Sequence, residues 1–293
     1  VNGIYRPTNT TLYVVGRMDD PGAVEAAVRA NWNGWEVRGE AVEWPDRPAP
    51  PEPKDRAIVV IDKERVTQTA VRLACQTGPA TMDNHEARQE LAGLMDRSAW
   101  VALREQAGVT YGAGSYSFGY NGGAANLYFS SLVQNDAVGL AVDVFLDMSK
   151  RAFEGDLDED RLTVNKLGSA RKYVLGHQTS GQMLNRIASA QTSGYGWDYI
   201  NGHAERLAAV RIEDVKAMAQ RCYEHEIITI IGPAAVVTPQ LDELGVEYTV
   251  FDWREEKERL FRENDPKEYK KAKKKEAREA KKKAKKEAKE GAK

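Results

Sequence analysis

The stretch TYGAGSYSFGYNGGAANLYFSSLV, residues 110–133, decides how the fold is interpreted. It contains two runs with alternating aromatic residues, joined by Asn121-Gly122-Gly123. Asn-Gly favours tight hairpin turns because both central positions of such a turn need a positive φ. We therefore expect a β-hairpin here, and with it a sheet that contains antiparallel strands.

The glycines of this stretch raise the question of a bound nucleotide. A dinucleotide fingerprint, G-x-G-x-x-G, follows a strand and opens a helix, so that backbone amides meet the pyrophosphate. After Gly112 and Gly114 the third position is Ser117, and the motif lies in a strand that a helix precedes. No G-x-x-x-x-G-K-[ST] occurs either. We expect no nucleotide cofactor.

The segments around the hairpin predict the fold class. Met82–Gln106 has helical spacing of its apolar residues, and residues 135–223 are helical almost throughout. Further strands are expected at 10–16, before an amphipathic helix that starts at Asp20, and at 57–62, 67–77, 227–232 and, as an edge strand, within 246–252. Strands paired locally by hairpins and followed by a block of helices are typical of an α+β fold. We predict a mainly antiparallel sheet flanked by helices.

The basic charge of the chain is concentrated at its C-terminal end. Residues 266–293 contain 14 lysines and arginines against 5 glutamates. Subtracting these from the totals of 42 and 44 leaves 28 basic and 39 acidic residues, a net charge of about −11 for residues 1–265. Domains that bind nucleic acid usually present a basic face, so we expect no nucleic-acid partner. The tail is low-complexity and lacks an apolar stripe, which predicts a solvated extension.

Other general features set limits on compartment and membrane association. No apolar run reaches the length of about 18 residues that a transmembrane helix needs. The chain begins at Val1, and we expect a processed or truncated product. Cys75 and Cys222 lie in apolar surroundings, so we expect buried free thiols. Such thiols occur in both reducing and oxidising compartments, so the cysteines do not indicate which compartment holds the protein.

The four histidines do not form a recognisable metal motif. His85, His177, His203 and His225 include no H-E-x-x-H or H-x-x-E-H pair, whereas a zinc site needs three or four converging ligands. We expect His85 to lie on a helix surface and Glu224–Glu226 to form an exposed turn. No arrangement typical of a serine or cysteine nucleophile is evident. The sequence therefore predicts no metal ligands and no catalytic residues in this chain.

Two polar residues at the entrance of the hairpin remain to be explained. Arg104 ends a predicted helix, and Tyr111 follows seven residues later at the start of a predicted strand. Taken alone, Arg104 would cap helical carbonyls or pair with a surface acid, and Tyr111 would pack across the strands.

Several motifs together resemble one family. YRPTNTTLYVVGRMD (residues 5–19) is similar to its Y-x-P-x-N-x-x-L-x-V-V-G-x-x-D segment, and VIDKERVTQTAVRLACQTGP (60–79) to its V-D-K-x-x-x-x-Q-x-x-I-x-L-G segment. RSAWVALREQAGVTYGAGSYSF (97–118) is similar to S-R-L-x-x-x-L-R-E-x-x-G-L-x-Y-x-x-x-S. Over residues 5–252 the chain thus resembles the C-terminal portion of a half of the pitrilysin/insulinase-type zinc metallopeptidases.

The resemblance implies a function. In that family two homologous halves enclose an extended peptide: one holds zinc through H-x-x-E-H, and the other contributes an arginine and a tyrosine seven residues apart. Arg104 and Tyr111 occupy those positions and are implied to bind substrate. The implied partner is a zinc-bearing half or subunit, in a hetero- or homodimer, and the implied cofactor is zinc in that partner. This chain alone is expected to be inactive.

The resemblance also leaves alternatives open. The family's zinc motif precedes the segment that begins at Tyr5, so the chain is either an inactive partner half or a fragment of an active enzyme whose zinc motif lies upstream of Val1. A scaffold or assembly subunit that kept the fold without proteolysis is a further alternative. DRSAW (96–100) replaces the usual S-R-L. Related paired subunits are bacterial envelope proteins, which favours a periplasmic or envelope location.

The expected division of the chain has four parts. Residues 1–44 form the strand–helix end segment of the peptidase-like domain, and a linker rich in proline spans 45–56. Residues 57–253 form the main peptidase-like domain, and 254–293 form the charged tail.

Overall fold

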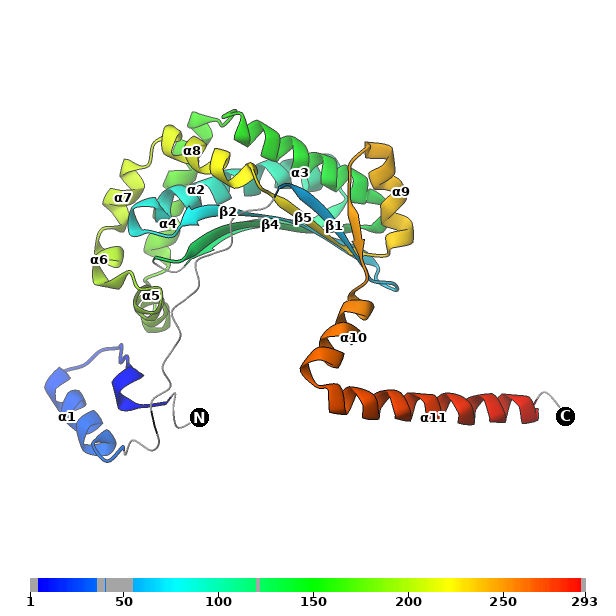
Figure 1. Ribbon diagram of the computed structural model, residues 1–293. Helices are drawn as coiled ribbons and strands as arrows, with labels where there is room; N and C mark the ends of the chain where they lie inside the picture. The colour runs from blue at the N-terminus through cyan, green and yellow to red at the C-terminus, as the bar shows by residue number, and fades with distance from the viewer. Residues whose placement is uncertain (1–4, 36–39, 41–54, 120–121, 291–293) are drawn as a thin grey trace.

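A six-stranded sheet lies at the centre of the computed structural model, which describes residues 5–35, 40, 55–119 and 122–290, with side chains to residue 279 (Figure 1). The strand order is β3-β4-β2-β5-β1-β6. The strands are β1 (Ala57–Asp62), β2 (Gln68–Pro79), β3 (Thr110–Gly119), β4 (Ala124–Gln134), β5 (Ile227–Gly232) and β6 (Thr249–Phe251). Neighbours from β3 to β5 pair antiparallel, and β1 pairs parallel with β5 and β6. The predicted α+β class with a mainly antiparallel sheet is confirmed.

Helices gather on one face of the curved sheet, and no helix of the described residues lies over the other face of β2 and β4 (Figure 1). The first helical layer contains α2, α3 and α8, which pack on β2 and β4 or on one another. The helical segments are η1 (Pro7–Asn9), α1 (Pro21–Trp32), α2 (Met82–Ala99), η2 (Trp100–Gln106), η3 (Asn135–Ala137), α3 (Val138–Phe153), α4 (Glu159–Leu175), α5 (Ser180–Thr192), α6 (Gly196–Asn201), α7 (His203–Ala209), α8 (Ile212–Tyr223), α9 (Ala234–Leu244), α10 (Trp253–Asn264) and α11 (Pro266–Glu290).

The predicted hairpin forms the edge of the sheet and supplies part of the core. In β4 every second residue from Ala125 to Val133 is buried, as the two-residue period of a strand requires. Phe129 from this row meets Phe145 of α3 edge-to-face, with ring centroids 4.5 Å apart. Burial of one such side chain contributes about 1.5–3 kcal/mol to stability. The apolar stripe of α3 thus covers the helix side of the hairpin.

The first two strands of the main domain, β1 and β2, are adjacent in sequence but do not pair with each other. β5 lies between them and pairs with both. β5 consists almost entirely of β-branched residues, and its Ile228 and Ile230 are buried, so the central position suits it. A partner about 160 residues away leaves no local signal in the sequence.

The prediction of a strand at residues 10–16 is wrong. Residues 10–15 have no strand or helix assignment, and Leu12 and Val14 are 46% and 48% exposed. A strand needs a neighbour to satisfy its backbone groups, and within the described residues no strand pairs with this run. The helix that follows is confirmed as α1, whose N-cap Asp20 accepts the N–H of Gly22 at 2.9 Å. The expected proline-rich linker lies outside the described residues except for 55 and 56.

The two cysteines are not free thiols, which corrects the expectation from sequence. Cys75 of β2 and Cys222 of α8 form a disulfide, with their Cα atoms 5.0 Å apart. Both residues are buried, at 5% and 0% exposure, which confirms the predicted burial. The prediction of free thiols is wrong. The bond ties α8 to the middle of the sheet.

Glu224–Glu226 is only partly an exposed turn. Glu226 is 2% exposed, and its Oε1 accepts a hydrogen bond of 2.9 Å from the Ser149 hydroxyl. Burial raises the pKa of Glu226 to about 7, although Ser149 and Arg56 act in the opposite direction. The prediction was wrong for Glu226 because this residue packs against α3 through Ser149, which lies 77 residues away in the sequence.

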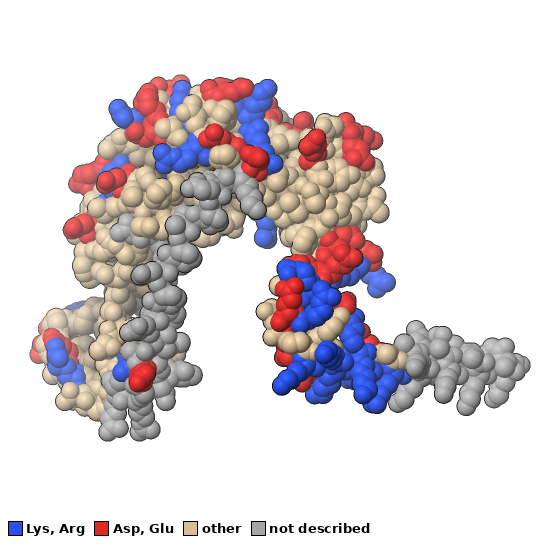
Figure 2. All heavy atoms as spheres, viewed as in Figure 1, with Lys and Arg blue, Asp and Glu red and all other residues tan. Residues whose placement is uncertain are grey.

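The C-terminal segment is helical. Figure 2 shows lysines and arginines gathered over α10 and α11. Tyr269 donates to Glu258 at 2.7 Å and Lys273 pairs with the same carboxylate at 3.1 Å, which joins the two helices. None of the helices in the described residues has the length and apolarity to cross a bilayer.

Candidate functional site

Arg104 lies on η2, the π-helical segment that extends α2. π-helical turns often occur at functional sites because they re-aim side chains. Leu103 is fully buried and anchors the segment, which leaves Arg104 and Glu105 facing solvent. Glu105 accepts hydrogen bonds from Arg97 at 2.9 Å and from the Trp100 indole at 3.1 Å. The segment is thus fixed on both sides of Arg104.

A tight corner brings the chain from η2 into β3. Gly108 has φ +67, a left-handed conformation that favours glycine. The N–H of Val109 donates to the carbonyl of Leu103 at 3.0 Å, which closes the corner. The sequence Arg104 to Tyr111 therefore turns back on itself and places its two ends beside each other.

A bulge at the start of β3 turns Tyr111 outward. The register between β3 and β4 shifts between Thr110 and Ala113. Thr110 is buried, and its hydroxyl accepts the N–H of Gly112 at 3.1 Å and donates to the carbonyl of Leu132 at 2.7 Å. The Ser131 hydroxyl donates to that of Thr110 at 3.0 Å. These buried hydroxyls hold the bulge, and their role was not foreseen from the sequence.

Arg104 and Tyr111 lie together at this corner. The guanidinium carbon of Arg104 is 5.4 Å from the centre of the Tyr111 ring, a cation–π distance. Arg104 Nη1 also donates to the carbonyl of Thr110 at 3.2 Å. Tyr111 is 83% exposed and does not pack across the strands as its local pattern favoured. The remaining guanidinium N–H groups and the phenol hydroxyl form a pair of exposed donors.

The histidines take structural roles in the helical layer. His85 Nε2 lies 2.7 Å from the Tyr199 hydroxyl, and burial lowers the pKa of His85 to about 4. The expectation of a surface histidine holds only in part: His85 is half-buried, because Tyr199 of α6 packs against its ring. His203 Nδ1 lies 3.1 Å from Glu86, which also pairs with Arg206 at 3.2 Å. Burial works against ionisation of Glu86, but the His203 hydrogen bond and nearby positive charge leave its pKa below the usual range.

These side chains do not fit a zinc ion. Zinc in proteins takes three or four ligands in tetrahedral arrangement. Within the described residues no three histidine, cysteine, aspartate or glutamate side chains converge to hold a metal. The carboxylate of Glu86 is already engaged by Arg206, whose positive charge opposes a cation at that place. We assign no metal ligand among the residues that the structure describes.

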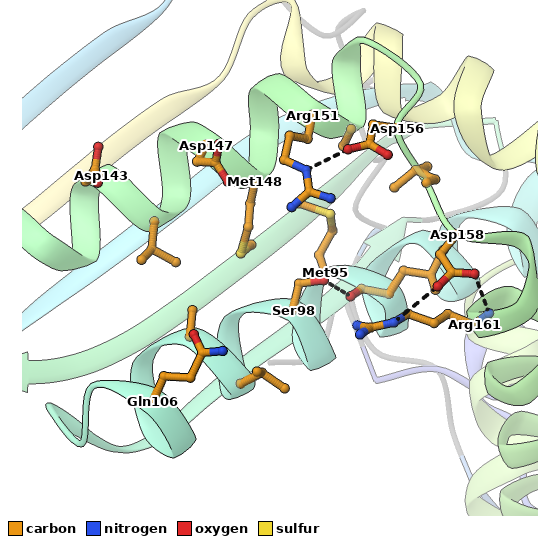
Figure 3. Close-up of a pocket in the computed structure, with 16 residues that line it drawn as sticks. Met95, Ser98, Gln106, Asp143, Asp147, Met148, Arg151, Asp156, Asp158 and Arg161 are labelled. Carbon is orange, nitrogen blue, oxygen red and sulfur yellow. Dashed lines mark hydrogen bonds and ion pairs between the residues drawn. The ribbon is translucent and has the colours of Figure 1, made fainter.

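A cavity of about 490 Å³ opens between the end of α2, η2, α3 and the start of α4 (Figure 3). Met95 and Met148 form an apolar part of its wall. Arg151 pairs with Asp156 at 2.7 Å at one end. Neither Arg104 nor Tyr111 lines the cavity. It is therefore separate from the exposed donor pair.

The comparisons with known proteins identify the class. Residues 1–167 match the family described as the Peptidase M16 inactive domain, so this chain belongs to that family. This confirms the resemblance to the C-terminal half of the pitrilysin-type peptidases. No curated protein matches the sequence.

Solved structures share the fold at low sequence identity. The Peptidase M16 inactive domain from Pseudomonas fluorescens is 15% identical with a TM-score of 0.60, over 73% of this chain and 52% of that one. A protease from Helicobacter pylori is 13% identical with a TM-score of 0.62, over 73% and 53%. A chain of complex III2 from Candida albicans is 13% identical with a TM-score of 0.57, over 77% and 56%. This chain thus spans about half the length of these structures.

Proposed function

We propose that this chain is the non-catalytic, peptide-binding half of a zinc metallopeptidase and that it works opposite a partner half which carries the zinc. The observation that carries the proposal is the exposed pair of Arg104 and Tyr111, 5.4 Å apart on a corner that buried residues fix. Membership of a family described as an inactive domain supports the non-catalytic role. The partner, a second subunit or a further part of the same polypeptide, supplies the metal.

Each member of the pair has a distinct part in the proposed mechanism. The outward N–H groups of the Arg104 guanidinium donate charge-assisted hydrogen bonds to a carbonyl of the peptide. The Tyr111 hydroxyl adds a neutral donor where negative charge develops on the oxygen of the attacked carbonyl. Because Arg104 is held by Thr110 and by the Tyr111 ring, little order is lost when the substrate binds.

The substrate in this proposal is an extended peptide. The body of the chain, residues 1–265, has a net charge of about −11, which attracts peptides with basic segments at long range. This long-range attraction falls with added salt, since the Debye length is about 8 Å at physiological ionic strength.

Reconstitution with the zinc-bearing partner tests the proposal. Arg104→Gln removes the charge and the donors and is expected to lower kcat/KM for peptide cleavage by about 10- to 10²-fold, the usual cost of one hydrogen bond from a charged group. Arg171→Gln is the matched control, because Arg171 is an exposed arginine on α4. Equal turnover of the Arg104 variant and the control refutes the assigned role. An assembly that binds zinc but cleaves no peptide supports the scaffold alternative instead.

A further inference from the structure

The uncovered face of the sheet carries almost no charge. Among all residues of the six strands, only Asp62 and Arg72 are charged. Asp62 accepts the N–H of Ala234 at 2.9 Å at the start of α9 and is thereby engaged. Arg72 is exposed, and no carboxylate of the described residues lies within ion-pair distance of it. Among the described strand residues, Arg72 is thus the one charged side chain that is not engaged by another element.

The register of the sheet places Arg72 at the centre of this face. In β2 the residues on either side of Arg72, Val71 and Leu73, are buried under the helices, so Arg72 points to the uncovered side. Ser130 of β4 and Thr229 of β5 lie directly opposite it. Directly opposed residues have Cβ atoms about 4.5–5.5 Å apart, so one hydroxyl residue stands on each side of the base of the Arg72 side chain.

Apolar residues form a row on each side of Arg72. The first row lies two residues after Arg72 in β2. It contains Ala74 and, on the neighbouring strands, Tyr128 and Tyr116. The rings of Tyr116 and Tyr128 stack with centroids 5.5 Å apart, and Phe118 stacks on Tyr128 at 5.1 Å. The other row, two residues the opposite way, contains Leu132, Ala70, Ile231 and Ile61. Adjacent rows lie about 6.8 Å apart, the repeat of two residues in any extended chain.

We propose that this surface is a peptide subsite in which Arg72 binds the carboxylate of an acidic side chain of an extended peptide. The peptide residues two positions before and two positions after the acidic residue carry apolar side chains. One of these side chains lies on the row that contains Tyr116 and Tyr128, and the other lies on the row that contains Leu132 and Ile231. Charge complementarity selects this occupant: an exposed guanidinium, in one row of the sheet with Ser130 and Thr229, matches a carboxylate, and stacked rings match apolar or aromatic groups. The subsite rests on the proposed peptide-binding function and adds a local preference to it.

The local preference is compatible with the acidic body. Long-range attraction depends on the net charge of the whole body, whereas the contact at Arg72 acts within a few ångströms. At about 0.15 M salt the long-range part is screened beyond about 8 Å, and the contact persists. The two effects are therefore separable by salt concentration.

Binding of a matched peptide pair to the full 293-residue chain tests the subsite. One fluorescein-labelled peptide carries leucine, glutamate and phenylalanine at alternating positions, and the other has glutamine in place of glutamate. Fluorescence anisotropy at about 0.15 M salt is expected to give about three- to tenfold tighter binding of the glutamate peptide, as for one accessible charge-assisted contact. Arg72→Gln abolishes the preference, Arg72→Lys retains part of it, and Arg171→Gln leaves it unchanged.

Three results overturn the subsite. Equal affinities of the two peptides for the unaltered chain do so, and so does a preference that survives Arg72→Gln. Binding of neither peptide also overturns it. These failures are distinguishable from failure of the proposed function, because that function is tested by the effect of Arg104→Gln on turnover, a readout that does not involve Arg72.

Discussion

Reduction of the disulfide between Cys75 and Cys222 is predicted to destabilise the chain strongly. The bond joins positions 147 residues apart and closes a loop that contains β3, β4 and most of the helices. In the chain-entropy account, closing a loop of this length lowers the conformational entropy of the unfolded state. This raises the free energy of unfolding by about 5 kcal/mol at 25 °C. Engineered bonds often give less, so this value is an upper estimate.

Urea unfolding with and without a reductant measures the effect. With a denaturant slope of about 2.5 kcal/mol/M, a loss of about 5 kcal/mol lowers the unfolding midpoint by about 2 M. The double variant Cys75→Ala/Cys222→Ala is the control, because its midpoint should not respond to reductant. Alkylation in denaturant before reduction should modify neither cysteine. A midpoint that is the same in both redox conditions, or two alkylated cysteines without reductant, refutes the reasoning.

Three further variants test the fold and its buried charges. Glu226→Gln is predicted to stabilise the chain by about 3 kcal/mol above pH 7 and to change its stability little below pH 4.5. The pKa of Glu226 is raised to about 7 in the folded state, so the folded chain favours the protonated carboxyl. The stability that the protonated carboxyl contributes is therefore lost as pH rises from 4.5 to about 7, and glutamine, which stays neutral, avoids this loss. Equal effects in thermal unfolding at pH 4 and pH 8 contradict it. Gly108→Ala should cost about 1–2 kcal/mol in urea unfolding because of φ +67, and an unchanged midpoint shows that the corner tolerates a side chain. Glu86→Ala leaves Arg206 buried without its carboxylate and should cost about 3–5 kcal/mol, whereas a loss below about 1 kcal/mol indicates that the pair is not desolvated.

Local sequence signals predicted those parts of the fold that local chemistry determines. The β3–β4 hairpin follows from Asn-Gly between aromatic runs, and α3 follows from an apolar stripe at helical spacing. The insertion of β5 between β1 and β2 was missed, because strand pairing across more than 150 residues depends on packing rather than on turn residues. The same reason explains the errors at Cys75 and Glu226 and the half-burial of His85, because the partners of all three come from distant segments.

The candidate site was accessible from the sequence only through the family resemblance. An arginine at a helix end and a tyrosine at a strand start have ordinary structural uses, and nothing local separates those from substrate binding. The structure adds the π-helical segment, the bulge held by Thr110 and Ser131, and the exposure of Tyr111. Arg72 drew no attention in the sequence, because its isolation is visible only when the strands are aligned by register.

The turnover of an assembly that contains Tyr111→Phe tests the central claim most directly. This variant removes one hydroxyl and keeps the ring beside Arg104, so substrate binding is expected to change little. The account predicts that kcat falls by about 10²-fold or more with KM nearly unchanged and with the same zinc content of the partner, since the lost donor acts mainly in the transition state. An unchanged kcat, or cleavage of peptide by this chain in the absence of its partner, contradicts it.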